Sequence, residues 1–283
     1  MGDPLPLTHM DWLTISRRAG EAIEEMLRAR PTTAERAAET GSTGSGGDST
    51  LEIDAAAERI VFGELERLRE RGLRFRALSE ERGEVSFGAA EPLVVIDPID
   101  GSLNAKRGIT HHALSLAVAT GTTMGDVEFG YVRDFGTGEE WWAARGLGAR
   151  LNDVPLDPSL GERRSAEGRI EVLGIESSDP RLLRRSIDSL VDRAYRLRAL
   201  GAIAPSLCQV AAARFDGLIS LRGCRSVDTA AAQLIVREAG GLISFPKFHE
   251  SLEAPLDLTA HSPVVAARAP GTLAELEAVC LLP

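Results

Sequence analysis

Two carboxylates follow directly from an apolar run in the stretch Leu93–Asn104, which reads Leu-Val-Val-Ile-Asp-Pro-Ile-Asp-Gly-Ser-Leu-Asn. The continuous apolar residues predict a buried strand. Pro98 lacks an N–H and has a fixed φ, so we expect the strand to end there, and Gly101 permits backbone angles that other residues resist. Asp97 and Asp100 are thus presented on a stiff turn, which suits a hard divalent cation.

Further acidic residues stand at the ends of other predicted elements. Asp54 and Asp228 each begin a predicted helix, and Glu80 and Glu81 follow a predicted strand. Each of them alone is better explained as a solvated side chain or a helix cap. If they converge on the turn, oxygen ligands without His or Cys predict Mg²⁺, or Mn²⁺, rather than zinc. Two such ions would polarise a phosphoryl group and lower the pKa of a bound water.

The residues after the second carboxylate favour the same chemistry. The hydroxyl of Ser102 is placed to orient or deprotonate a water molecule, and the N–H groups of Gly101 and Ser102 would hold phosphate oxygens if a helix begins here. Competing motifs fail. Gly41–Gly47 has the glycine spacing of a P-loop, but Gly47 stands where Lys is required, and the chain has no HExxH and no GxSxG.

The elements that position these residues are predicted from hydrophobic periodicity. The glycine-rich stretch 39–50 is typical of either a flexible linker or a mobile active-site loop. His111 and His112 are expected inside a strand, on opposite faces. Helices are predicted over 11–30, 51–71, 179–191, 202–214, 227–239 and 272–280, and strands over 74–78, 92–96, 112–120, 126–133, 139–143, 170–174, 194–200, 217–221, 242–245 and 263–267.

A polar stretch over 153–168 with little pattern suggests a boundary between two lobes. We expect an N-terminal α+β lobe, 1–155, that carries most of the metal ligands. The second lobe, 156–283, carries the last metal-binding Asp and the residues on the substrate side. Strands and helices alternate in this second lobe, which indicates an α/β arrangement.

Length and composition limit the remaining possibilities. The 283 residues suit one large domain or two closely packed ones. A formal net charge of −10 argues against nucleic acid or an anionic membrane as a partner. The three cysteines are far apart, 1–10 has no signal-peptide pattern, and no apolar run approaches about 20 residues. A cytoplasmic location is therefore predicted.

Taken together, these motifs resemble the inositol monophosphatase superfamily over nearly the whole chain. A second group of motifs is most similar to its archaeal-type branch, whose enzymes act on inositol 1-phosphate and fructose 1,6-bisphosphate. The superfamily motifs are Ser79–Glu81, Val95–Ser102, Ser226–Ala231 and Glu238–Gly241, and the branch motifs are Gly44–Asp48, Ile53–Asp54, Leu200–Ala204 and Leu207–Cys208.

The resemblance implies a five-layered αβαβα sugar-phosphatase fold of mixed α/β class, a homodimer, and Mg²⁺-dependent, Li⁺-sensitive hydrolysis. It implies two or three Mg²⁺ ions per subunit. The first ion would be bound by Glu80, Asp97 and the carbonyl of Ile99. The second would be bound by Asp97, Asp100 and Asp228.

The resemblance also implies a catalytic set. Glu80 and Asp54 match positions that hold a third ion or its water, and Ser102 stands where the family usually has Thr, which keeps the hydroxyl. Gly101 and Ser102 would bind phosphate through their backbone N–H groups. The residues implied to line the substrate side are Gly201, Ala202 and Ile203.

One departure concerns substrate choice. Family members often carry an acid a few residues before the last metal-binding Asp, where it binds substrate hydroxyls, but here Ser220 or Leu221 takes that place. Arg222 and Arg225 lie nearby and favour a more anionic substrate such as a bisphosphate, unless they are only surface charges on a loop. The predicted substrate-binding set is Asp100, Gly101, Ser102, Gly201, Ala202, Ile203, Arg222, Arg225 and Asp228.

The function expected from the sequence is Mg²⁺-dependent hydrolysis of a small phosphate monoester by an activated water. The first candidates are inositol 1-phosphate and fructose 1,6-bisphosphate. Histidinol phosphate and 3′-phosphoadenosine 5′-phosphate are alternatives within the enzyme class. A non-catalytic, metal-binding dimer with the same fold is the alternative from another class.

Overall fold

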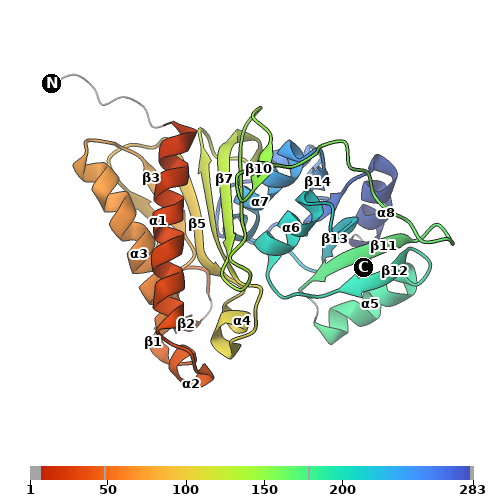
Figure 1. Ribbon diagram of the computed structural model, residues 1–283, viewed down its shortest axis with the longest axis horizontal. Helices are drawn as coiled ribbons and strands as arrows, with labels where there is room; N and C mark the ends of the chain where they lie inside the picture. Colours follow the sequence, from red (N-terminus) through yellow and green to blue (C-terminus); the bar gives the residue numbers. More distant parts are fainter. Residues whose placement is uncertain (1–7, 48, 178, 281–283) are drawn as a thin grey trace.

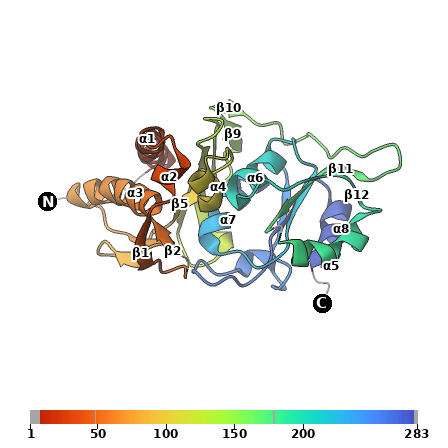
Figure 2. The same cartoon turned by 90° about the horizontal axis from the view of Figure 1, so that it is seen from below.

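Helices and sheets alternate in five layers along the long axis of the molecule (Figures 1 and 2), as the family resemblance implies. The computed structural model describes residues 8–47, 49–177 and 179–280. An eight-stranded sheet forms the second layer and a five-stranded sheet the fourth. The first helical layer holds α1 (His9–Arg28) and α3 (Glu52–Glu70), the central one α6 (Ile203–Ala211) and α7 (Ser226–Glu238), and the last one α5 (Pro180–Leu190) and α8 (Pro270–Cys280).

The larger sheet has the strand order β10-β9-β8-β7-β6-β5-β3-β4, and within it only β3 and β5 run parallel. All its strands lie between residues 76 and 155. They are β3 (Arg76–Ser79), β4 (Gly83–Ser86), β5 (Leu93–Asp100), β6 (Ala113–Ala119), β7 (Val127–Asp134), β8 (Glu140–Ala144), β9 (Ala149–Leu151) and β10 (Val154–Pro155).

The smaller sheet has the order β12-β11-β13-β15-β14, with β11 parallel to both β12 and β13. It begins after the polar stretch that follows β10, and the lobe boundary at residue 155 stays a prediction. Between helix layers and sheets lie three buried apolar clusters, one beneath α1 and α3, one around α6 and α7, and one beneath α5 and α8. The strands are β11 (Ile170–Glu176), β12 (Ala194–Arg198), β13 (Gly217–Ser220), β14 (Leu242–Ser244) and β15 (Val265–Ala267).

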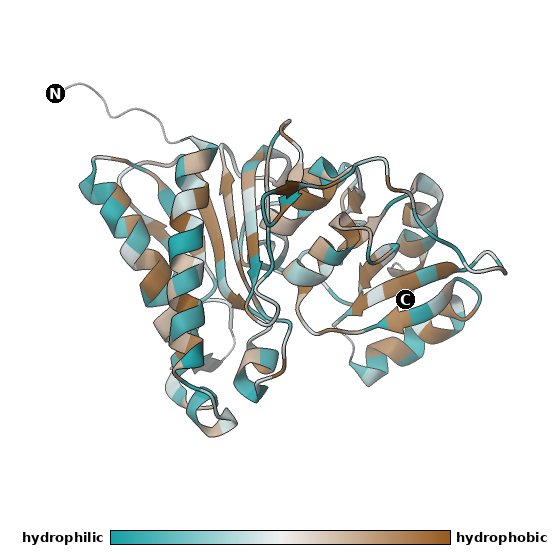
Figure 3. Cartoon of the chain, viewed as in Figure 1, coloured by the Kyte–Doolittle hydropathy of each residue, from teal (hydrophilic) through white to brown (hydrophobic). Residues whose placement is uncertain are grey.

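The first helix shows how the sequence sets an element. Thr8 and Asp11 form a capping box, in which the N–H of Thr8 donates to Asp11 Oδ2 at 2.9 Å and the N–H of Asp11 donates to Thr8 Oγ1 at 3.3 Å. Trp12, Leu13 and Ile15 are buried in the apolar cluster that α1 forms with α3 and the larger sheet. Polar residues line the outward side of this helix, and the strands behind it are apolar (Figure 3). No helix in 8–47, 49–177 or 179–280 is long and apolar enough to cross a membrane.

Several local predictions were wrong or incomplete. The stretch 39–50 is not a loop throughout, because β1 (Glu39–Thr43) and β2 (Ser49–Leu51) pair as an antiparallel hairpin; Asp48 lies outside the described residues. His111 and His112 precede β6 rather than lying in it, since His111 has a positive φ of 81° that no strand accommodates. The short elements β4, β9, β10, α2 (Thr33–Arg36) and α4 (Ser102–Arg107) were not predicted.

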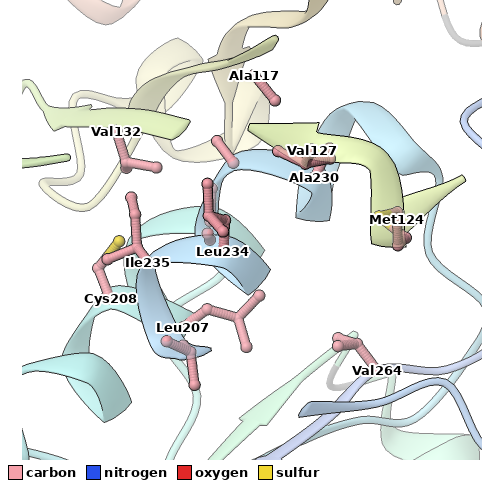
Figure 4. Packing of buried hydrophobic residues seen from close by; sticks show 14 of the residues in the cluster. Ala117, Met124, Val127, Val132, Leu207, Cys208, Ala230, Leu234, Ile235 and Val264 are labelled. Atoms are coloured by element: carbon pink, nitrogen blue, oxygen red, sulfur yellow. The ribbon is translucent and has the colours of Figure 1, made fainter. Parts of the chain in front are cut away.

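The central helix α7 is covered on both sides, with every residue from 226 to 236 buried. Its apolar side chains meet those of β7 and α6 (Figure 4). Gly130 lets β7 approach the helix closely, because a Cβ at this glycine would stand 2.5 Å from the carbonyl oxygen of Ala231. A helix between two sheets therefore depends on small residues at its contacts.

Gly130→Ala is expected to lower the free energy of unfolding by about 1–3 kcal/mol, because the new methyl group meets a backbone atom that cannot rotate away. Gly63→Ala is the matched control: it lies within α3, and a Cβ added there would approach no other described part of the chain within 4 Å. There alanine should stabilise by about 0.5–1 kcal/mol. Urea denaturation of both variants checks the prediction, which is wrong if Gly130→Ala unfolds like the wild type.

Candidate active site

Strand β5 carries both carboxylates of the turn, and it continues past the proline that was expected to end it. All eight of its residues are buried, and pairing with β6 becomes irregular between Asp97 and Asp100. This irregularity accommodates Pro98, which has no N–H to donate to a neighbouring strand. The N–H of Ile99 donates instead to Asp97 Oδ1 at 2.9 Å, which fixes the Asp97 side chain across the turn.

The chain then turns sharply into the short helix α4. Gly101 has a φ of +87° and a ψ of 39°, a left-handed conformation that favours glycine. Ser102, the first residue of α4, donates its hydroxyl to the carbonyl oxygen of Ile99 at 3.0 Å. A helix therefore does begin where the proposed phosphate-binding N–H groups require one.

The predicted site residues come from both sheets and meet at one cavity of about 660 Å³. Asp54 lies in the first turn of α3, Glu80 follows β3, and Asp228 lies in the first turn of α7. Every residue predicted for the site lines this cavity: Asp54, Glu80, Asp97, Ile99, Asp100, Gly101, Ser102, Gly201, Ala202, Ile203, Arg222, Arg225 and Asp228.

Asp54 is a buried carboxylate whose hydrogen-bonding capacity is only partly used. Its Oδ2 accepts the N–H of Leu51 at 3.4 Å, while its Oδ1 is buried and has no hydrogen-bond partner among the residues that the structure describes. Burial raises the pKa of Asp54 to about 7, and the charge of Glu81 adds to the rise. An oxygen in this state is suited to a cation or to a water molecule.

The remaining carboxylates repel one another in the same confined space. Burial raises the pKa of Glu80 to about 7, although Arg225 opposes the shift. Burial also raises the pKa of Asp97 and Asp100 well above the usual value, and the charges of neighbouring acids, Asp228 among them, raise both further. Such a cluster is electrostatically unfavourable until positive charge is brought to it.

Arg225 supplies part of that positive charge. Its Nη2 lies 2.7 Å from Glu80 Oε1 and 3.5 Å from Asp228 Oδ1. In 8–47, 49–177 and 179–280, no three His, Cys, Asp or Glu side chains are arranged as a ready-made metal site. The guanidinium group of Arg225 therefore contacts two of the carboxylates that are predicted to bind a divalent cation.

The residues predicted to line the substrate side, 201–203, are joined to the turn at Gly101 and Ser102. The N–H of Ala204 donates to Asp100 Oδ2 at 2.6 Å. A Cβ at Gly101 would stand 2.8 Å from the Cβ of Ala202, so these two backbone segments are in close contact. The walls of the cavity contributed by the two sheets therefore have a fixed relative position.

One wall of the cavity was not predicted from the sequence. Neither Ser220 nor Leu221 lines the cavity. Ser220 is buried in the core, where its hydroxyl donates to the carbonyl oxygen of Arg222 at 2.8 Å. The signal that could have revealed the missing wall is the polar run directly after a predicted parallel strand, at 176–179. Besides Glu81, the cavity is also lined by Glu39, Leu51, Leu103, Lys106, Glu176, Ser177, Asp179 and Leu182.

The five-layered fold, with a strand–turn–helix and converging carboxylates at a cavity between its sheets, together with the matches described next, identifies a phosphoric monoester hydrolase. Its sequence matches the profile of the inositol monophosphatase family over residues 7–280. The chain belongs to the inositol monophosphatase family, which is generally metal-dependent and acts on small phosphorylated substrates.

Individual relatives agree with this assignment. A fructose-1,6-bisphosphatase/inositol-1-monophosphatase of Methanothermobacter thermautotrophicus is 34% identical over 90% of this chain and 91% of its own length. The Nus factor SuhB of Escherichia coli is 32% identical over 82% of this chain and 84% of its own. A crystal structure described as an inositol monophosphatase–fructose 1,6-bisphosphatase superimposes with a TM-score of 0.81 at 26% identity, covering 95% of this chain and 99% of that one.

Proposed function

We propose that this chain is a Mg²⁺-dependent phosphatase of a small metabolite, with inositol 1-phosphate, fructose 1,6-bisphosphate or both as substrates. The observation that carries the proposal is the convergence of largely buried carboxylates from α3, the end of β3, β5 and α7 on one cavity beside the turn at Gly101 and Ser102. The similarity to an archaeal fructose-1,6-bisphosphatase/inositol-1-monophosphatase supports the choice of substrates.

The donor set of the cavity fits a hard divalent cation. It consists of carboxylate and carbonyl oxygens, with a buried oxygen on Asp54 that has no partner among the described residues. Glu80, Asp97 and the carbonyl of Ile99 would hold one ion, and Asp97, Asp100 and Asp228 a second. A third would be held near Glu80 and Asp54. We propose Mg²⁺, with Mn²⁺ as the other ion of the same chemistry.

When bound, such ions would offset the carboxylate charge, polarise the phosphoryl group and activate a water for in-line attack. The chain's own residues supply orientation. The backbone N–H groups of Gly101 and Ser102 would hold phosphate oxygens, while Asp54 and the hydroxyl of Ser102 would align the attacking water. The segment Gly201–Ile203 faces the alcohol part of the ester.

Two arginines at the cavity bear on the choice of substrate. Arg222 is exposed at the cavity and Arg225 lies deeper, so both could meet a second phosphate group. Histidinol phosphate and 3′-phosphoadenosine 5′-phosphate are the alternative substrates. We also propose that the protein acts as a homodimer in the cytoplasm, because the resemblance to the family implies the dimer and the cysteine usage favours a reducing compartment.

Phosphate release from a panel of esters tests the proposal. The panel contains inositol 1-phosphate, fructose 1,6-bisphosphate, histidinol phosphate and 3′-phosphoadenosine 5′-phosphate, each with Mg²⁺ or with a chelator in excess. We expect release from one or both of the first two with Mg²⁺ and none with the chelator. Release that persists with the chelator would contradict the metal requirement, and preference for either of the last two would overturn the substrate assignment.

A further inference from the structure

Glu176 is a buried acid at the cavity for which the proposed chemistry has no role. It ends β11, has 1% of its surface exposed and lines the cavity. Its Oε2 accepts the N–H of Gly201 at 2.9 Å, and its Oε1 accepts the N–H of Leu200 at 3.3 Å and the hydroxyl of Ser206 at 2.6 Å. Burial raises the pKa of this carboxyl, and the three donors oppose that rise.

The hydrogen bonds of Glu176 continue into the first lobe. Ser206 Oγ lies 2.9 Å from His111 Nε2, and His111 Nδ1 lies 3.7 Å from Asp134 Oδ2 at the end of β7. Asp134 is itself held by the N–H of Gly136, which donates to its Oδ1 at 2.7 Å. The carboxylate of β11 is therefore connected to the larger sheet through side chains that are largely buried.

The segment that Glu176 binds is fixed from its other side as well. Asn104 of α4 donates from its Nδ2 to the carbonyl oxygen of Leu200 at 2.7 Å and to that of His111 at 2.9 Å. Gly201 has a φ of +92°, a left-handed conformation, and the chain bends there. Glu176 holds the N–H groups of the segment and Asn104 holds a carbonyl, which leaves the backbone little freedom.

We propose that Glu176 is a positioning residue that fixes the Gly201–Ile203 wall and thereby determines how tightly the alcohol part of the substrate binds. The inference rests on the proposed phosphatase function. Glu176 acts through the wall, because its oxygens are turned toward the segment and only 1% of its surface is exposed. The phosphate subsite lies on the other wall, at Gly101 and Ser102, so loss of Glu176 should weaken contacts to the alcohol and spare contacts to phosphate.

Glu176→Gln tests this division, since it keeps the side-chain volume but places an NH₂ group against one of the three donors. We expect the KM for inositol 1-phosphate, or for whichever panel ester the wild type prefers, to rise about tenfold or more. The inhibition constant of inorganic phosphate, which has no alcohol part, should stay within about twofold. Ser206→Ala removes one of the donors and should show the same pattern with a smaller rise in KM.

Asp216→Asn is the matched control, because Asp216 is an equally buried carboxylate that accepts the N–H groups of Arg163 at 2.8 Å and Val172 at 2.9 Å away from the cavity. It should change neither constant. Equal rises in KM and in the phosphate constant of Glu176→Gln would indicate general distortion and overturn the inference. So would an unchanged KM in both Glu176→Gln and Ser206→Ala.

Hydrogen–deuterium exchange separates this inference from the proposed function. The amides of Leu200 and Gly201 should exchange faster in Glu176→Gln than in the wild type, and they should be unchanged in Asp216→Asn. If the wild type hydrolyses no ester, the proposed function fails while this measurement still tests the role of Glu176. Unchanged exchange at both amides would show that Glu176 does not fix the segment.

Discussion

Asp97→Asn is expected to lower kcat/KM by about 10³-fold or more, a loss of about 4 kcal/mol of transition-state stabilisation. Asp97 is the one side chain assigned to both of the first two cation positions, and an uncharged amide is a weaker ligand for a hard cation than a carboxylate. The amide keeps the volume of the side chain, and its oxygen can still accept the N–H of Ile99. Phosphate release with Mg²⁺ at several concentrations measures the loss.

The same substitution should stabilise the protein when divalent cations are absent. Asp97 is 2% exposed, and the charges of Glu80, Asp100 and Asp228 all raise its pKa in addition to burial. Removing one charge from this cluster should raise the free energy of unfolding by about 1–2 kcal/mol. Mg²⁺ should stabilise the wild type strongly and the variant weakly, because binding to the folded state alone adds to stability.

Two results would contradict the assignment of Asp97. One is phosphate release by Asp97→Asn at the wild-type rate. The other is a Mg²⁺-induced increase in stability equal to that of the wild type. Asp216→Asn serves as the control here too, because it removes a buried carboxylate outside the cavity. It should keep wild-type turnover and lose stability, since Asp216 pairs with backbone N–H groups rather than with other acids.

The five layers were predicted from the resemblance to a family, whereas each long element was predicted from its own hydrophobic pattern. The apolar run before Asp97 indicated a buried strand, and the alternation after residue 170 indicated an α/β arrangement of strands and helices; the structure confirms both. The short elements could not be predicted in this way. β1 and β2 have few apolar residues, and they are strands only because they pair with each other.

Pro98 illustrates a second limit. Its missing N–H predicted the end of a strand, but the irregular pairing between β5 and β6 places it where no donor is needed. Glu176 illustrates a third. It stands beside Ser220 across the parallel pair β11–β13, far away in the chain. That Glu176 and Ser220 are neighbours follows from the order of the strands in the sheet, which the sequence pattern alone does not specify. The wall of the cavity that contains Glu176 was therefore not predicted.

Gly101→Ala is expected to lower kcat/KM by about 10²-fold or more and the free energy of unfolding by about 2–4 kcal/mol. Alanine at a φ of +87° is strained by about 1–2 kcal/mol. Its Cβ would also stand 2.8 Å from the Cβ of Ala202, 3.2 Å from the carbonyl oxygen of His111 and 3.4 Å from that of Gly201. These atoms belong to the backbone or to a short side chain and cannot rotate away. The turn at residues 101–102 and the segment 201–203 must therefore move apart.

Gly108→Ala separates strain from displacement. Gly108 ends α4 with a φ of +67°, and a Cβ at this position would have no atom of another described segment within 4 Å. This variant should lose stability from strain alone and keep its turnover.

Ala202→Gly in the Gly101→Ala background removes the nearest clash and should recover part of the lost kcat/KM, while the strain at residue 101 persists. If Gly101→Ala and Gly108→Ala affect turnover equally, close contact between the 101–102 turn and the 201–203 wall is not what catalysis requires. Steady-state kinetics and urea denaturation of the four proteins would decide this, because displacement lowers turnover and strain lowers only stability.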